Sequence, residues 1–316
     1  MADELGPLAV GVDVGGSGIK AAVVDVASGR LLGDRLRLVT PEPSVPHAVV
    51  ETLAALLEQL RVDEPRPDDS GAAHRNGGQR DERAADEAAE GGPGQARIEA
   101  RPSAAVDSAD RTPKRLALRR DAARGAPVGV GFPAPVIGGV TRAAANIDPG
   151  WVDYPAEQEM RVRLGRPVAV ANDADVAGIA EMRFGAGRGV DGTVMVLTIG
   201  TGIGSAIFVD GRLVPNTELG HLQVRGKDAE KRASDAARSR RGLGWGEWAV
   251  LLDEYLTTLQ HLFWPDLFIL GGGVSKRSER FLPRLTVKVP VVPATLLNDA
   301  GIVGAACVAR ERFPSE

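Results

Sequence analysis

Three glycine clusters, far apart in the chain, each follow a run rich in β-branched residues. The first cluster holds Asp13, Gly15, Gly16, Ser17, Gly18 and Lys20, the second Gly200, Thr201 and Gly202, and the third Gly271, Gly272 and Gly273. Glycines let backbone N–H groups approach an anion without a Cβ in the way, the Ser17 hydroxyl can add a donor, and the Asp13 carboxylate can orient a metal ion or its water. One such cluster is explained equally well as a hairpin turn, but three in one chain indicate phosphate binding. None has the spacing of a P-loop or of the GxGxxG fingerprint.

Asn172 and Asp173 come directly after the predicted strand RPVAV. The carboxylate can take the proton of a hydroxyl that attacks a phosphoryl group, and the amide can bind a hydroxyl. Helix capping is the alternative, because either side chain can accept from free N–H groups at the start of the predicted helix ADVAGIAE. Spacing alone favours capping. If Asp173 is the base instead, Asp175 becomes the candidate cap.

Glu218 and His221 lie three positions apart in NTELGHLQV. A carboxylate and an imidazole can grip vicinal hydroxyls, since both accept hydrogen bonds and the imidazole also donates. The alternative is a pair of polar residues on a surface turn. Asn146, in AAANIDPGW, adds another amide that a turn would also explain. His221 has no second His or Cys nearby in the sequence, which disfavours a metal-ligand role.

Two similar strand–glycine turn–strand units, residues 8–26 and 193–211, must position two of these clusters. Other predicted strands cover about 31–39, 127–131, 166–172 and 266–270, and predicted helices cover about 44–60, 174–185, 248–263 and 300–310. Alternating strands and helices with a repeated unit favour a fold class of two α/β lobes with facing phosphate loops.

Residues 62–124 differ in character from the rest of the chain. They are mostly Asp, Glu, Arg, Ala, Gly, Pro and Ser, without Phe, Trp or Tyr. Such a composition buries too little apolar surface to offset the entropy of ordering, so we expect a solvated, disordered insertion.

Composition limits the partners of the chain. A net charge of −4 over 316 residues excludes a global basic field for nucleic acid or an anionic membrane surface. No apolar run approaches the roughly 20 residues of a membrane span, and the acidic start MADEL does not resemble a signal peptide. The single cysteine, Cys307, permits no internal disulfide. We expect a cytoplasmic protein.

Taken together, the motifs resemble the ROK family of sugar kinases within the actin-like ATPase superfamily. DVGGSGIK and LTIGTGIGSA resemble its phosphate motifs, LGGGVSK its nucleotide-side motif, and AAANID, ANDADVAG and ELGH its sugar-binding and catalytic segments. Many members have a zinc-binding cysteine cluster after the ELGH-type motif. Its absence here, with WGEW and the ending PATLLNDAGIVGAA, is most similar to the bacterial polyphosphate glucokinases within the family.

The resemblance implies a role for each candidate residue. Asp173 becomes the general base, and the glucose contacts become Asn146, Asn172, Asp173, Glu218 and His221. The three glycine clusters become contacts to the phosphates of polyphosphate or ATP, and Asp13 becomes a Mg²⁺ contact, directly or through water, with no zinc in the protein. The implied fold has an N-terminal lobe (1–143, on which the final helix 300–316 packs back), a C-terminal lobe (144–299), and a homodimeric assembly.

Two alternatives remain open. One is an ATP-only kinase of another hexose, and the other is a non-catalytic sugar sensor, which the presence of Asp173 disfavours. The sequence also departs from the family at Gln223, where an acidic residue is expected, and in the length of the insertion. A set of basic residues is the candidate track for a long polyanion: Lys227, Lys231, Arg232, Lys276, Arg277 and Arg280.

The composition of the insertion generates the first prediction. Replacing residues 66–110 with a short Gly/Ser linker should leave the melting temperature and the activity nearly unchanged, because the segment lacks the apolar residues needed for packing. Differential scanning fluorimetry and an activity assay check this. A melting temperature lower by many degrees would mean that the segment folds against the body of the protein.

Overall fold

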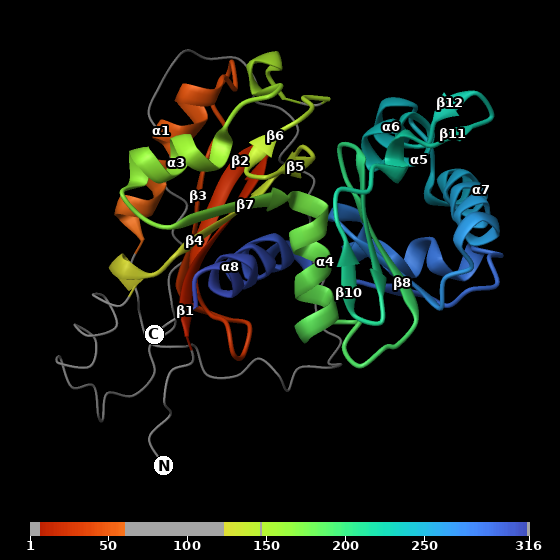
Figure 1. Cartoon of the computed structure of the whole chain (residues 1–316). Helices are drawn as coiled ribbons and strands as arrows, with labels where there is room; N and C mark the ends of the chain where they lie inside the picture. The colour runs from red at the N-terminus through yellow and green to blue at the C-terminus, as the bar shows by residue number, and fades with distance from the viewer. Residues whose placement is uncertain (1–6, 61–122, 146, 315–316) are drawn as a thin grey trace, which may run out of the picture.

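The computed structural model describes residues 7–60, 123–145 and 147–314. Most of the expected insertion, as well as Asn146, lies outside the described residues. The described chain contains two five-stranded sheets with the orders β3-β2-β1-β4-β7 and β10-β9-β8-β13-β14. Helices α4 and α8 lie between the two sheets (Figure 1).

The strands of the first sheet are β1 (Leu8–Gly15), β2 (Gly18–Asp25), β3 (Arg30–Leu38), β4 (Val128–Phe132) and β7 (Val168–Asn172). Those of the second are β8 (Thr193–Ile199), β9 (Ile203–Val209), β10 (Arg212–Val214), β13 (Leu267–Gly271) and β14 (Val291–Pro293). Two small hairpins pair β5 (Val136–Ile137) with β6 (Val140–Thr141) and β11 (Gln223–Val224) with β12 (Lys227–Asp228).

The α-helices labelled in Figure 1 are α1 (Pro46–Gln59), α3 (Ala156–Leu164), α4 (Asp173–Phe184), α5 (Glu230–Ala233), α6 (Asp235–Arg240), α7 (Trp245–Phe263) and α8 (Ala300–Arg312). Short 3-10 helices are η1 (Pro149–Trp151), η2 (Leu219–His221), η3 (Gly273–Arg280), η4 (Leu282–Arg284) and η5 (Leu297–Asp299). None of the described helices is both long and apolar enough to cross a bilayer.

The two sheets share one design. In each, the first two strands in chain order form an antiparallel hairpin around a glycine turn, and the first of them pairs in parallel with a later strand. The carboxyl ends of β1, β4 and β7 therefore meet at one edge of the first sheet, and those of β8 and β13 meet at one edge of the second. Ligands of open α/β sheets bind at such edges.

The first sheet runs past the lobe boundary expected at residue 143, because β7 pairs in parallel with β4. The stretch between the expected boundary at residue 143 and β7 was not expected to contain a helix. It contains α3, which packs on α1 and β7. Helix α3 was missed because AEQEMRVRL is mostly charged, and its few buried side chains give only a weak helical periodicity. The second lobe therefore begins after β7.

Helix α8 approaches its neighbours backbone to backbone. A Cβ on Gly11 of β1 would lie 1.9 Å from the carbonyl oxygen of Ile302, and one on Gly129 of β4 would lie 1.7 Å from that of Ala305. A Cβ on Gly304 would lie 1.6 Å from the carbonyl oxygen of Val176 in α4. Three glycines thus let α8 lie directly against β1, β4 and α4.

This packing predicts the effect of a single methyl group. Gly304→Ala should lower the melting temperature by about 2 °C or more, because the clash is with backbone that cannot rotate away and overpacking costs about 1–3 kcal/mol or more. Gly125→Ala is the matched control, since a Cβ there meets nothing within 4 Å and the residue is exposed. Scanning calorimetry checks both; equal melting temperatures would contradict the packing argument.

Candidate active site

The candidate site begins at the carboxyl ends of three parallel strands of the first sheet. In their register Asp13 of β1 lies opposite Gly131 of β4, and Asn172 of β7 lies opposite Phe132 of β4. A Cβ on Gly131 would lie 3.7 Å from the Cα of Asp173. The sheet therefore brings together two candidate residues, Asp13 and Asp173, that are 160 positions apart in the chain.

The structure resolves the capping alternative in favour of Asn172. Its side-chain oxygen accepts from the backbone N–H groups of Ala174 (2.8 Å) and Asp175 (3.1 Å), which makes Asn172 the N-cap of α4. Asp175 is not the cap: its Oδ2 accepts from the backbone N–H of Asn216 at 2.8 Å. Asp173 is the first helical residue, and its Oδ1 accepts from the N–H of Ala174 at 2.8 Å.

The surroundings of Asp173 favour the protonated form of its carboxyl group. Burial raises the pKa of Asp173 to about 7, and the nearby carboxylates of Asp13, Glu218 and Asp175 act in the same direction, against the N–H of Ala174. Burial also raises the pKa of Asp175, to about 6. A carboxyl group whose pKa lies near neutrality can accept a proton from a substrate hydroxyl.

The first glycine cluster forms a two-residue hairpin turn between Gly15 and Gly18. Lys20 pairs across the hairpin with Asp13, its Nζ lying 2.8 Å from Oδ2. Arg37 of β3 packs over Gly18 and donates to the carbonyl oxygen of Ser17 at 2.8 Å. Arg37 was missed by the sequence analysis; it adds a second cation beside the turn.

The second and third clusters contact each other. Gly271 is the register partner of Thr198, and a Cβ on Gly272 would lie 2.3 Å from the carbonyl oxygen of Ile199, just before Gly200. Gly272 has a positive φ of 79°, which favours glycine. On the opposite side, a Cβ on Gly204 would lie 2.8 Å from the Cβ of Ala174. Strand β9, which follows the second loop, therefore contacts the start of α4, beside Asp173.

Glu218 and His221 flank the 3-10 turn η2 and face each other, with Oε2 and Nε2 3.8 Å apart. Burial raises the pKa of Glu218, and His221 lowers it. The other ring nitrogen of His221 lies 3.9 Å from carboxylate oxygens of both Asp228 and Glu230. Carboxylates therefore lie beside His221 although residue 223 is a glutamine.

Gln223 itself donates to Asp228 at 2.5 Å. Among the described residues, no group of three or more His, Cys, Asp or Glu side chains is arranged to hold a metal ion. The sugar-binding and phosphate-binding roles stay predictions, and Asn146 lies outside the described residues.

Asn216 holds this loop against the first lobe, a role that sequence analysis missed. Its side chain accepts from the N–H of Val136 (2.8 Å) and donates to the carbonyl oxygen of Val136 (3.1 Å). Its backbone N–H donates to Asp175 of α4. Its positive φ of 58° is typical of Asn in a turn; the adjacent Pro215 and Thr217 gave only a general turn signal.

The ROK family model matches residues 116–237. A polyphosphate glucokinase of Mycobacterium tuberculosis (strain CDC 1551 / Oshkosh) is 38% identical over 297 residues, which cover 94% of this chain and 89% of that protein.

Solved structures agree. An inorganic polyphosphate/ATP-glucomannokinase from Arthrobacter sp. strain KM superposes with a TM-score of 0.76 and 43% identity, covering 97% of this chain and 99% of that one. A ROK family glucokinase from Streptomyces griseus, solved with glucose and AMPPNP, shares the fold with a TM-score of 0.65 and 24% identity, covering 96% and 99%. The two-lobed actin-like fold expected from the sequence is thereby confirmed. The chain belongs to the ROK family.

Proposed function

We propose that this protein phosphorylates glucose to glucose 6-phosphate, with inorganic polyphosphate as the phosphoryl donor and ATP as a second donor. The observation that carries the proposal is the state of Asp173. Its carboxyl group is not the helix cap, its pKa is raised to about 7, and the carboxylates of Asp13 and Glu218 are close enough to contribute to that rise. The names of the relatives, polyphosphate glucokinase and polyphosphate/ATP-glucomannokinase, support the choice of acceptor and donors.

The reaction balances with the residues available. The oxygen of the glucose 6-hydroxyl forms a bond to the terminal phosphorus of the donor while the bridging P–O bond breaks, and the donor leaves shortened by one phosphate. Asp173 receives the hydroxyl proton. Backbone N–H groups of the glycine loops, with Lys20 and Arg37, stabilise the charge on the transferred group. Glu218, His221 and Asn172 orient the sugar hydroxyls.

Mg²⁺ is compatible with this site. Magnesium is usually held by one or two carboxylates together with phosphate oxygens and water. Asp13 supplies such a carboxylate, partly exposed and close enough to Asp173 to raise its pKa. Asp13 would hold the ion, which would neutralise charge on the donor phosphates.

The role of Asp173 is tested by Asp173→Asn. The substitution keeps the shape and removes the proton acceptor, so kcat should fall by about 10²- to 10⁴-fold. Glucose should still raise the melting temperature, because binding to the folded state is retained. Asp191→Asn, at an exposed loop position, is the matched control and should keep its activity. Near-normal turnover of the Asp173 variant would remove the carboxyl group from the mechanism.

The raised pKa of Asp173 also predicts how the substitution Asp173→Asn changes the stability of the folded protein at different pH values. The pKa of Asp173 is raised in the folded state from 3.8 to about 7, so the folded protein binds this proton more tightly than the unfolded chain. Its contribution to stability is therefore fully present below pH 3.8 and is lost as the pH rises to about 7. Without ligands, Asp173→Asn should melt higher than the original protein at pH 8, by a smaller margin at pH 5. Equal margins would contradict the raised pKa.

The donor is tested by direct assay. We expect glucose 6-phosphate to form from polyphosphate at low salt, and long chains to be preferred over short ones. Their kcat/KM should fall steeply with ionic strength, because binding a polyanion releases counterions, and ATP should respond less. Turnover with ATP but with no polyphosphate of any length would leave an ATP-dependent hexokinase.

A further inference from the structure

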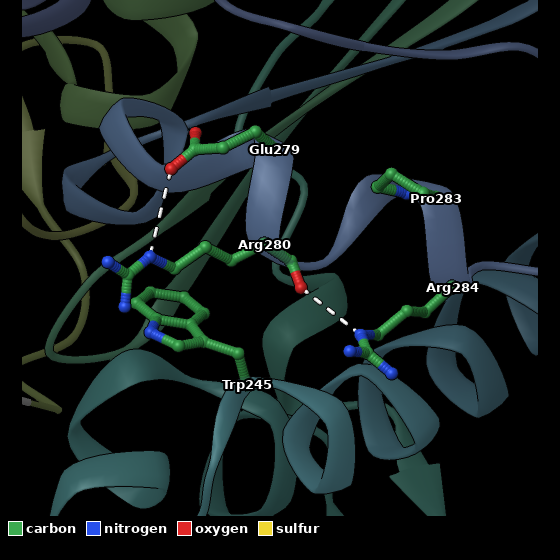
Figure 2. Close-up of a pocket in the computed structure, with 5 residues that line it drawn as sticks. All are labelled: Trp245, Glu279, Arg280, Pro283 and Arg284. Atoms are coloured by element: carbon green, nitrogen blue, oxygen red, sulfur yellow. Dashed lines mark hydrogen bonds and ion pairs between the residues drawn. The ribbon is translucent and has the colours of Figure 1, made fainter.

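A pocket of about 470 Å³ lies on the second lobe, away from Asp173. Its lining residues are Trp245, Glu279, Arg280, Pro283 and Arg284. Figure 2 shows the Arg280 side chain running beside the Trp245 indole, with Arg284 on the next turn. Two of the lining side chains are guanidinium groups. The proposed mechanism leaves this pocket without a function.

The indole at the pocket is held firmly by its neighbours. Trp245 stacks on Phe281 (centroids 6.0 Å apart) and meets Trp248 edge-on (5.6 Å). The guanidinium carbon of Arg238 lies 4.3 Å from the centre of the indole ring. Arg238 also pairs with the Asp235 carboxylate at 2.7 Å, so its charge is already neutralised and its role is to hold the indole in place.

Both donor loops lead to this pocket. From the second loop, the carbonyl oxygen of Gly200 accepts from the N–H of Ala236 (3.1 Å) in α6, the helix that carries Arg238. From the third loop, η3 runs over the eight residues Gly273–Arg280 to the pocket. Eight residues at the roughly 2 Å rise of a 3-10 helix cover at most roughly 16 Å, and the non-helical backbone of Arg277 bends this path.

The basic residues of the candidate track separate into two groups. Lys231 pairs with Asp228 at 2.7 Å and Arg232 pairs with Glu254, so both are already neutralised. Lys227 is exposed but lies on the β11–β12 hairpin and not on η3. Lys276 and Arg277 on η3 are exposed, and neither forms an ion pair with another described residue.

The two arginines of the pocket are equally accessible. Within the described chain the one ion pair of Arg280 is with the exposed Glu279, at 3.8 Å, which is a weak interaction. Arg284 donates to the carbonyl oxygen of Arg280 at 3.3 Å and has no ion pair within the described chain. The available charge therefore follows η3 from the third glycine loop to the pocket.

We propose that the Trp245 pocket and η3 form a tether for the distal phosphates of a long polyphosphate chain, while its terminal phosphate lies at the glycine loops. The tether rests on the proposed function. A second attachment on the same chain raises the effective concentration of the donor at the site without contacting the reacting atoms. It therefore acts on long donors and adds nothing to the binding of short ones.

The experiment compares kcat/KM for long-chain polyphosphate, short-chain polyphosphate and ATP in the double variant Arg280→Ala/Arg284→Ala. The ratio of long-chain to short-chain kcat/KM should fall about 10-fold, because the second attachment is lost. The dependence of log kcat/KM on log salt for the long donor should become shallower by about 1–2 units, one for each lost phosphate contact. The double Arg→Lys variant keeps the charge and should retain most of the ratio.

Arg212→Ala, on exposed β10 at the far edge of the same sheet, is the control for loss of a surface charge outside the pocket and should keep the original ratio. An unchanged ratio in the double alanine variant overturns the tether. An equal loss with ATP also overturns it, since the pocket would then act on every donor. If the original protein uses ATP but no polyphosphate, the proposed function fails first, and that result is distinct from the other two.

Discussion

The close approach of α8 to its neighbours is the constraint on which the site depends. Gly11, Gly129 and Gly304 allow the α8 backbone to touch β1, β4 and α4, where any Cβ would overlap a carbonyl oxygen. This contact fixes α4 relative to the first sheet, and the first residue of α4 is Asp173. The distance from Asp173 to Asp13, on which the charge distribution of the site depends, is therefore set by packing between two backbones that have little freedom to adjust.

The same geometry places several carboxyl groups close together, so that each disfavours the ionised form of the others. Asp13, Asp175 and Glu218 all raise the pKa of Asp173, which burial raises further. Lys20 offsets part of this through its pair with Asp13, whereas the Oδ1 atom of Asp175 is buried without a hydrogen-bond partner. Such an arrangement costs stability in the free protein, and strongly shifted carboxyl groups of this kind are common at catalytic sites. Cations on the donor would relieve the repulsion when the substrates bind.

Sequence alone predicted the parts of this design that have local signals. The hairpins around the glycine clusters, the strand before Asn172 and the long amphipathic helix ending at Phe263 lie where they were expected. The role of Asp173 could not be separated from capping, because Asn172 and Asp173 are adjacent and both residue types cap helices. Arg37 and Asn216 carry no motif: their importance comes from contacts made by distant segments, which no spacing along the chain encodes.

At Asn216 the type of side chain matters as well as its position in the fold. Its amide exchanges both a donor and an acceptor with Val136, as a neighbouring strand would. An aspartate could not donate, a glutamine would be too long, and a β-branched residue would strain the positive φ. On its other side, the loop packs Gly220 against the carbonyl oxygen of Ile203, in the second sheet. The loop that carries Glu218 and His221 is thus held from both lobes. These two side chains keep their place relative to Asp173 only while the contact of Asn216 with Val136 and that of Gly220 with Ile203 both persist.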